Sequence, residues 1–150
     1  MELYIYIMMF ILGSVIGSFL NVVAVRLSNN ESIIYPSSHC HVCNHKLKWY
    51  ELIPIVSYLI QKGKSRCCHN KIPVSYLIVE IVTGALYCTS YHSFGLSYDL
   101  IISLIFISSL MIIIISDIEY MIILDEVIAV ASITIILLEL IFYGLTFTAE

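Results

Sequence analysis

Long apolar segments are the most constraining feature of this sequence. Four stretches, residues 3–27, 74–91, 100–115 and 127–143, carry almost no charge, and a membrane-spanning helix needs roughly 20 such residues. Over all 150 residues, 60% are hydrophobic and 12% are charged, and the mean hydropathy is +0.97. Soluble domains contain roughly 25% charged residues, so an ordinary water-soluble globular protein is excluded. The sequence predicts an all-α integral membrane protein with about four transmembrane helices in the lipid bilayer.

The basic residues are confined to one part of the chain. All seven Lys and Arg residues lie between Arg26 and Lys71, and Lys and Arg in short loops stay in the cytoplasm. We therefore expect a first transmembrane helix at 1–27 with its N-terminus outside, and a cytoplasmic loop at 28–72. Residues 73–150 then contain the other three helices. We expect no nucleic-acid partner, and the oligomeric state stays open.

The first apolar stretch has small residues on one face. Gly13 and Gly17 are four residues apart, a spacing that lets two helices approach closely in lipid. A cleaved signal peptide is the alternative for this stretch. Signal peptides begin with basic residues and have an apolar region of roughly 7–15 residues, whereas this run is longer and follows Glu2. We therefore favour a retained helix.

Four of the five cysteines lie in the polar loop. Cys40 and Cys43 form a C-x-x-C pair, and Cys67 and Cys68 follow. A reducing cytoplasm argues against disulfides, and sites of four cysteines, or of three cysteines and a histidine, usually hold structural zinc. We predict a zinc site in which the fourth ligand is Cys67, His69 or a histidine near the first pair. Free thiols are the alternative.

Residues 49–60, between the two cysteine pairs, are apolar and aromatic but too few to cross a bilayer. Trp and Tyr side chains prefer the headgroup region of a membrane. We expect this segment to lie on the membrane surface.

Acidic residues cluster in the polar break at 116–126, after the third apolar stretch. Asp117, Glu119, Asp125 and Glu126 have no Lys or Arg within 40 positions in the sequence. Carboxylates at a membrane boundary are candidate functional groups. Helix capping at the water boundary is the alternative, which we favour for Glu119 and Glu126.

Asp117 is suited to acid–base work on a peptide bond, but aspartyl proteolysis needs two carboxyls that share a proton about 3 Å apart. Asp125 lies eight residues later, about 12 Å along a helix, so the two cannot pair on one helix. The partner must come from a tight turn, from Glu80 or Glu139 on another helix, from a second copy, or from residues that this sequence lacks.

Together these segments resemble the bacterial type IV prepilin peptidases, membrane aspartyl enzymes that cleave leader peptides from prepilins and N-methylate the new terminus. The motifs that carry the resemblance are GSFLNVV followed by Arg at 17–26, the C-x-x-C pair, YLIVE at 76–80 and the acidic segment at 117–125.

The resemblance implies that Asp117 is one of two catalytic aspartates and that the loop is a zinc-binding element, for which we predict the four loop cysteines as ligands. Asp125, Glu119 and Glu80 are candidate supporting residues. The implied substrate is a prepilin or pseudopilin, and the methyl donor, where methylation is retained, is S-adenosylmethionine.

The sequence departs from the family pattern at several positions. Ser65 stands where the family has the first cysteine of the second pair, Glu119 replaces an Asp, and Leu124 replaces a Pro. The second catalytic aspartate of the family lies in a GxGD motif, and no G-x-G occurs in these residues. We therefore expect the N-terminal portion of such an enzyme, which does not cleave prepilins alone. The first alternative is a truncated, non-catalytic homologue that binds membrane partners through its zinc loop, and the second is an unrelated small polytopic protein.

Overall fold

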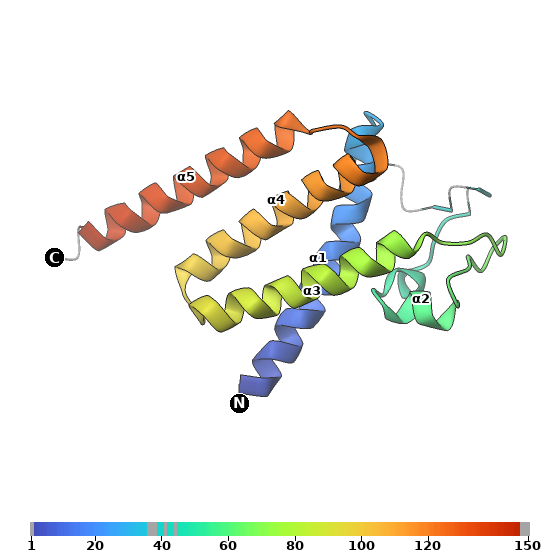
Figure 1. Ribbon diagram of the computed structural model, residues 1–150, viewed down its shortest axis with the longest axis horizontal. Coiled ribbons are helices and arrows are strands. Elements are labelled where there is room, and N and C mark those ends of the chain that lie inside the picture. The colour runs from blue at the N-terminus through green and yellow to red at the C-terminus, as the bar shows by residue number, and fades with distance from the viewer. Residues whose placement is uncertain (1, 36–38, 41, 44, 148–150) are drawn as a thin grey trace.

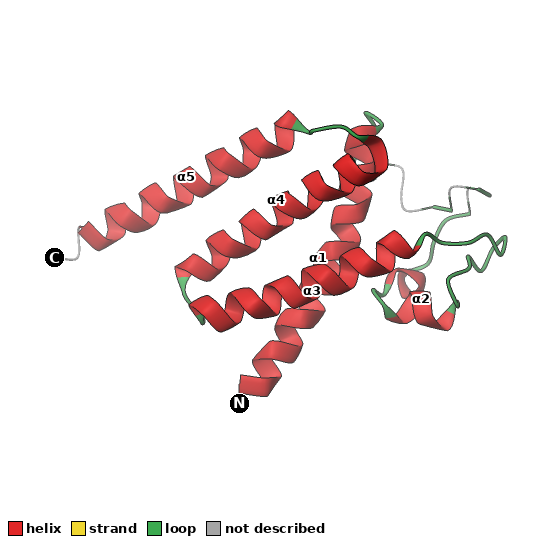
Figure 2. Ribbon diagram, viewed as in Figure 1, coloured by secondary structure: helices red, strands yellow, loops and turns green. Residues whose placement is uncertain are grey.

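The computed structural model describes residues 2–35, 39, 40, 42, 43 and 45–147, the last five of them through their backbone only. Within these residues the chain is helical and has no strand, which confirms the predicted fold class (Figure 1). Figure 2 shows loop structure mainly between the first two long helices. The elements are α1 (Glu2–Ser28), the 3-10 helix η1 (Trp49–Leu52), α2 (Val56–Ile60), α3 (Val74–Phe94), α4 (Tyr98–Tyr120) and α5 (Asp125–Phe147).

Three helices, α1, α3 and α4, are long and apolar enough to cross a membrane within the part of the chain that the structure describes. They coincide with the first three predicted spans, so the chain is a membrane protein. The helix α5 lies where the fourth span was expected, and its assignment as a span stays a prediction.

Glycines bring α1 and α3 into direct backbone contact. A Cβ atom on Gly13 would lie 2.8 Å from the Cα of Gly84 and 2.8 Å from the carbonyl oxygen of Thr83. One on Gly17 would lie 2.9 Å from the Thr83 hydroxyl. The predicted close approach at the paired glycines is confirmed, and any larger residue there would push the two helices apart.

The core of the bundle lies between α1, α3 and α4. Buried side chains of all three helices meet there, and they include Leu20, Val79 and Met111. The helix α5 packs against α4 as the second arm of a helical hairpin (Figure 1). The core therefore fixes how α1, α3 and α4 sit together.

The helix α4 extends further than its apolar residues. Residues 116–120, expected in a polar break, are helical, and the chain turns only at Met121, whose φ is 54°. The backbone N–H of Met121 donates to the carbonyl oxygen of Asp117 at 3.0 Å. Hydropathy marks where apolar side chains end, whereas backbone hydrogen bonds continue until the backbone conformation changes. Asp117 consequently lies in the last turn of a helix, and only residues 121–124 connect α4 to α5.

Candidate functional site

Two short turns, residues 39–46 and 64–71, carry the cysteines of the loop. In each turn an antiparallel bridge joins the first residue to the last. The backbone N–H of Cys40 donates to the carbonyl oxygen of His45 at 2.9 Å. The backbone N–H of Ser65 donates to the carbonyl oxygen of Asn70 at 2.8 Å, so both bonds span five residues. The two turns therefore have the same hydrogen-bond register.

The four loop cysteines form one cluster in which all sulfur atoms lie within 4.8 Å of one another. The Sγ atoms of Cys40 and Cys68 are 3.6 Å apart, and those of Cys67 and Cys68 are 3.8 Å apart. Four sulfurs at the Zn–S distance of about 2.3 Å around a tetrahedral ion are about 3.8 Å from each other. Among the described residues the cluster contains four thiols and no histidine, so its donor set fits a tetrahedral metal ion such as zinc.

The second turn supplies one of its two sulfurs from a different position than the first turn does. In the common register Ser65 is the counterpart of Cys40, and Cys68 is the counterpart of Cys43. The sulfur that Ser65 cannot supply comes from Cys67, whose Sγ lies 2.9 Å from the Ser65 hydroxyl. The buried Ser65 hydroxyl also donates to the Cys40 sulfur at 3.6 Å. Ser65 thus supports the cluster through its hydroxyl, and Cys67, two residues later, supplies the sulfur.

The two thiols of the C-x-x-C pair differ in acidity. The backbone N–H groups of Cys43 and Val42 point at the Cys40 sulfur and, with the Ser65 hydroxyl, lower the pKa of Cys40 from 9.0 to about 5. A hydrogen bond with Cys67, at 2.8 Å between sulfurs, raises the pKa of Cys43 to about 12. Cys40 is therefore a thiolate at neutral pH, the form that binds metals.

The buried Arg26 side chain fixes the path of the chain where it leaves α1. Its Nη1 atom donates to the carbonyl oxygens of Ser32 and Ile33 at 3.1 and 2.9 Å. The arginine of the first motif consequently folds the start of the loop back onto the end of α1.

The end of α4 is joined to the loop ends of α1 and α3. The Ser75 hydroxyl in the first turn of α3 donates to the Glu119 carboxylate at 3.2 Å. The Asn29 side-chain amide, just after α1, donates to the Tyr120 hydroxyl at 3.3 Å. The acidic segment and the cysteine loop therefore lie at the same end of the helices. Sequence reasoning missed Ser75, Asn29 and Tyr120, because no local pattern marks a contact between residues so far apart in the chain.

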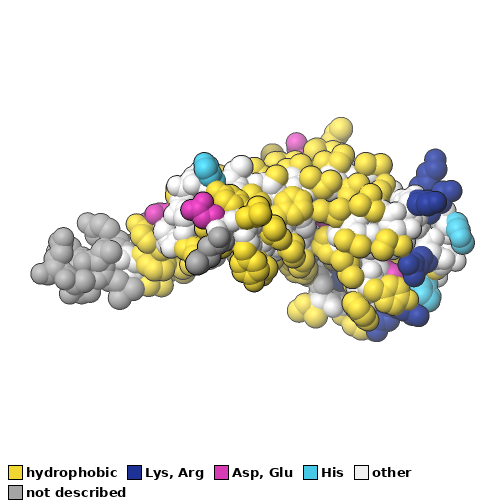
Figure 3. All heavy atoms as spheres, turned by 90° about the horizontal axis from the view of Figure 1, so that it is seen from below, with side chains coloured by type: hydrophobic (Ala, Val, Ile, Leu, Met, Phe, Trp, Pro, Cys, Tyr) yellow, Lys and Arg dark blue, Asp and Glu magenta, His cyan; other side chains and the backbone are white. Residues whose placement is uncertain are grey.

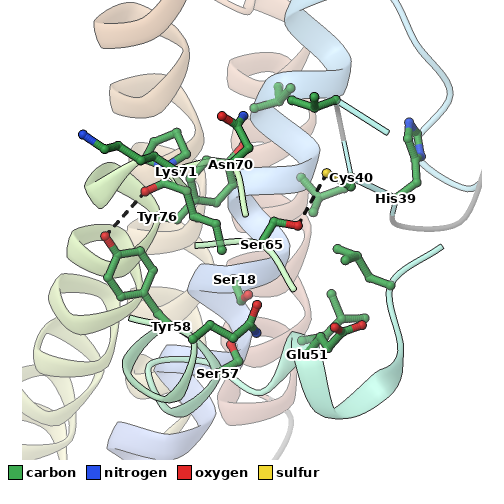
Figure 4. Close-up of a pocket in the computed structure, with 18 of the residues that line it drawn as sticks. Ser18, His39, Cys40, Glu51, Ser57, Tyr58, Ser65, Asn70, Lys71 and Tyr76 are labelled. Atoms are coloured by element: carbon green, nitrogen blue, oxygen red, sulfur yellow. Dashed lines mark hydrogen bonds between the residues drawn. The ribbon is translucent and has the colours of Figure 1, made fainter. Parts of the chain in front are cut away.

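A cavity of about 550 Å³ lies at this end, between the cysteine loop and the ends of α1, α3 and α4. Figure 4 shows Tyr58 and Tyr76 on one side of it, with Ser65 and Cys40 at the cysteine cluster. Its lining contains four carboxylates, Glu31, Glu51, Glu80 and Glu119, and two basic side chains, Arg26 and Lys71. The volume is in the range of small-molecule pockets, and acidic groups outnumber basic ones in the lining.

The structure places the acidic residues that were predicted as site residues in different environments. Asp117 is exposed in the last turn of α4, and the exposed Asp125 begins α5, where its charge suits the helix N-terminus. Glu119 lines the cavity and binds α3, a role beyond the capping that we favoured. The buried Glu80 accepts the backbone N–H of Ile55 at 2.7 Å, so this carboxylate connects α3 to the loop.

Residues 11–94 match the family model described as the Bacterial Peptidase A24 N-terminal domain. The chain belongs to this family. The match covers most of α1, the whole cysteine loop and α3, which are the elements that build the cavity together with the end of α4.

Curated relatives carry the name prepilin leader peptidase/N-methyltransferase. The protein of Myxococcus xanthus is 41% identical over 104 residues, which cover 69% of this chain and 31% of the relative. That of Bacillus subtilis is 39% identical over 119 residues, which cover 79% of this chain and 48% of the relative. The resemblance to prepilin peptidases is thereby confirmed, and the chain spans about a third to a half of the length of these relatives. No solved structure matches the chain.

Proposed function

We propose that the chain acts in prepilin processing, as part of a membrane aspartyl endopeptidase that cleaves the leader of a type IV prepilin or pseudopilin. The observation that carries the proposal is the cavity that joins the cysteine loop to the acidic end of α4. Membership of the A24 N-terminal domain family supports it.

The distribution of charge supports a cytoplasmic site. Lys and Arg residues of short loops stay inside, and all seven lie between Arg26 and Lys71. The N-terminus is then outside, and the loop, the cavity and Asp117 are at the cytoplasmic face. A basic leader peptide on that side would be attracted by the carboxylates that line the cavity.

Asp117 is proposed as one catalytic carboxyl, with Asp125 and Glu119 near it in sequence as supporting residues. In aspartyl proteolysis one carboxylate takes a proton from water while the other, protonated, donates to the substrate. Glu80 accepts a backbone hydrogen bond from the loop, so we assign it to the support of the site. The second catalytic carboxyl is proposed to be the GxGD aspartate of the family, and we expect no cleavage by these 150 residues alone.

Cleavage can be tested by producing the chain in bacterial membranes that lack prepilin peptidase. A tagged prepilin is co-produced, together with the part of the Bacillus subtilis relative beyond the matched region. We expect mature pilin, detected by mass, with the unchanged chain and none with Asp117→Asn. Glu126→Gln is the matched control, because Glu126 is an exposed carboxylate in the first turn of α5. Cleavage by the Asp117→Asn variant would refute the assignment.

The structural metal is proposed to be zinc, held by Cys40, Cys43, Cys67 and Cys68. It would fix the two turns of the loop and take no part in peptide hydrolysis. Stoichiometric zinc in the reduced, purified chain is the expected result of metal analysis.

S-adenosylmethionine is proposed as the methyl donor if the chain takes part in N-methylation. The cavity offers carboxylates for its positive charges and the rings of Tyr58 and Tyr76 for its base. Saturable binding of labelled S-adenosylmethionine, weakened by Tyr76→Ala, is the expected result.

The second candidate function is that of a non-catalytic protein that binds prepilins through the zinc loop. The position of the cysteine cluster at the cavity favours it as well. Photocrosslinking of the leader to the chain, without cleavage in the combined production above, would distinguish it from the peptidase.

A further inference from the structure

The segment 49–60 exposes large apolar side chains. Trp49 is 77% exposed, and Leu59 and Ile60 on α2 are each 63% exposed. The opposite side of α2 faces the protein: the Tyr58 hydroxyl donates to the carbonyl oxygen of Ile72 at 3.5 Å. The helix α2 therefore has an inner side that lines the cavity and an outer apolar side that the described chain leaves uncovered.

A partly buried hydrogen bond fixes the position of α2 along α3. The carboxylate of Glu80 accepts the backbone N–H of Ile55, the residue before α2, at 2.7 Å. Glu80 lies six residues after the start of α3, which is about 9 Å along the helix. Because α3 is long and apolar enough to cross a membrane, α2 is held beside the first two turns of a span. If α3 crosses the bilayer from its first turn, the outer side of α2 lies close to the membrane surface.

Basic side chains flank the segment 49–60. Figure 3 shows Lys and Arg side chains gathered at one end of the molecule next to hydrophobic ones. Lys48 and Arg66 lie over the ring of Tyr50, 5.9 and 5.4 Å from its centre. Lys62 and Lys64, both exposed, follow directly after α2. Apolar residues flanked by Lys and Arg are typical of segments that lie in the interface of an anionic membrane.

We propose that residues 49–60 form a membrane-surface anchor, which inserts Trp49 and the outer side of α2 into the headgroup region of an anionic leaflet. The bilayer is the occupant that the observations favour, because spans on both sides of the loop hold it at the membrane whatever else is present. Because the loop is tethered to the membrane, the effective concentration of lipid beside it is high, and an acidic protein partner would have to compete with that lipid. The anchor fixes the cavity at the membrane surface, and it is independent of whether the chain cleaves a substrate.

Trp49 is the one tryptophan of the chain, so its fluorescence reports on the anchor without labelling. The purified chain is placed in nanodiscs of phosphatidylcholine alone or with phosphatidylglycerol, each with lipid brominated near the headgroup end of the acyl chain. We expect quenching to be about twofold stronger with phosphatidylglycerol. In 1 M NaCl, where the Debye length is about 3 Å, the difference between the two nanodiscs should disappear.

Two variants separate the apolar and the basic contributions. Leu59→Gln should reduce the quenching, and Lys62→Gln with Lys64→Gln should abolish its dependence on lipid charge. Ile34→Gln is the matched control, because Ile34 is an exposed apolar residue of the same loop outside the anchor. Circular dichroism in the same nanodiscs checks that each variant keeps its helices. Absent quenching, equal quenching in both nanodiscs at low salt, or equal losses for Leu59→Gln and Ile34→Gln would each overturn the proposal.

Discussion

The use of Cys67 in place of Ser65 gives a sharp test of the proposed metal site. In the common register of the two turns, Ser65 occupies the position of Cys40, and Cys67 supplies the sulfur instead. Cys67→Ser should therefore leave three thiolates. Adding Ser65→Cys to that variant should return the fourth sulfur from the regular position.

The expected magnitude follows from the number of ligands. Structural zinc sites of zinc-finger peptides bind with about 10–16 kcal/mol, and four sulfurs share this site. The loss of one ligand then costs about 3–4 kcal/mol, or roughly a 100- to 1000-fold weaker affinity. The double variant should bind within about tenfold of the unchanged chain, since its four sulfurs keep the tetrahedral donor set.

Affinity can be measured by zinc competition with a chromophoric chelator, using reduced protein in detergent. Cys88→Ser is the matched control, because Cys88 lies in α3 and outside the cluster. Unchanged affinity of the Cys67→Ser chain would show that Cys67 is no ligand. Failure of the double variant to regain affinity would refute the equivalence of the two turns.

Two further predictions concern proton release and helix packing. Zinc must displace the proton of Cys43, whose pKa is about 12, so affinity should rise with pH, and calorimetry in buffers of different ionisation enthalpy should detect proton release. Below pH 5 affinity should fall more steeply, because Cys40, with a pKa of about 5, also takes up a proton. Gly13→Val should destabilise the bundle by about 1–3 kcal/mol, since its Cβ would meet backbone atoms of α3 at 2.8 Å. A lower unfolding midpoint in a dodecyl sulfate titration, absent in the control Val15→Leu on the exposed side of α1, checks this.

Hydropathy was sufficient to predict the four long helices but not where they end. The apolar run of α4 stops at Ile115, and the helix continues through Asp117 and Glu119 to Tyr120. A polar residue in the last turn of a helix costs little free energy. The apolar side chains therefore stop several residues before the helical backbone conformation does. The setting of Asp117, in a helical turn and not in a loop, could therefore not be predicted from the apolar pattern.

The cysteine cluster was predictable because its ligands are few in kind and their chemistry is restrictive. Ligand chemistry alone left Cys67, His69 and another histidine as candidates for the fourth position, because the choice depends on the register of two turns that are 25 positions apart in the sequence. The contact between Asn29 and Tyr120 depends in turn on how α1, α3 and α4 pack. Sequence patterns report periodicity along one segment, whereas such contacts arise from the packing of several.

The loop has almost no core of its own, which explains why its shape depends on these few contacts. Among its described residues Ser65 alone is buried, and a polar unit of this size buries too little apolar surface to stabilise itself. The sulfur cluster holds the two turns together, Glu80 holds the start of α2, and the packing of α1 on α3 brings the two ends of the loop together. Because the sulfur cluster, the Glu80 hydrogen bond and the packing of α1 on α3 each act on a different part of the loop, none of these contacts can replace another. The cavity beside the acidic end of α4 therefore depends on the four clustered cysteines, although none of them needs to touch a substrate.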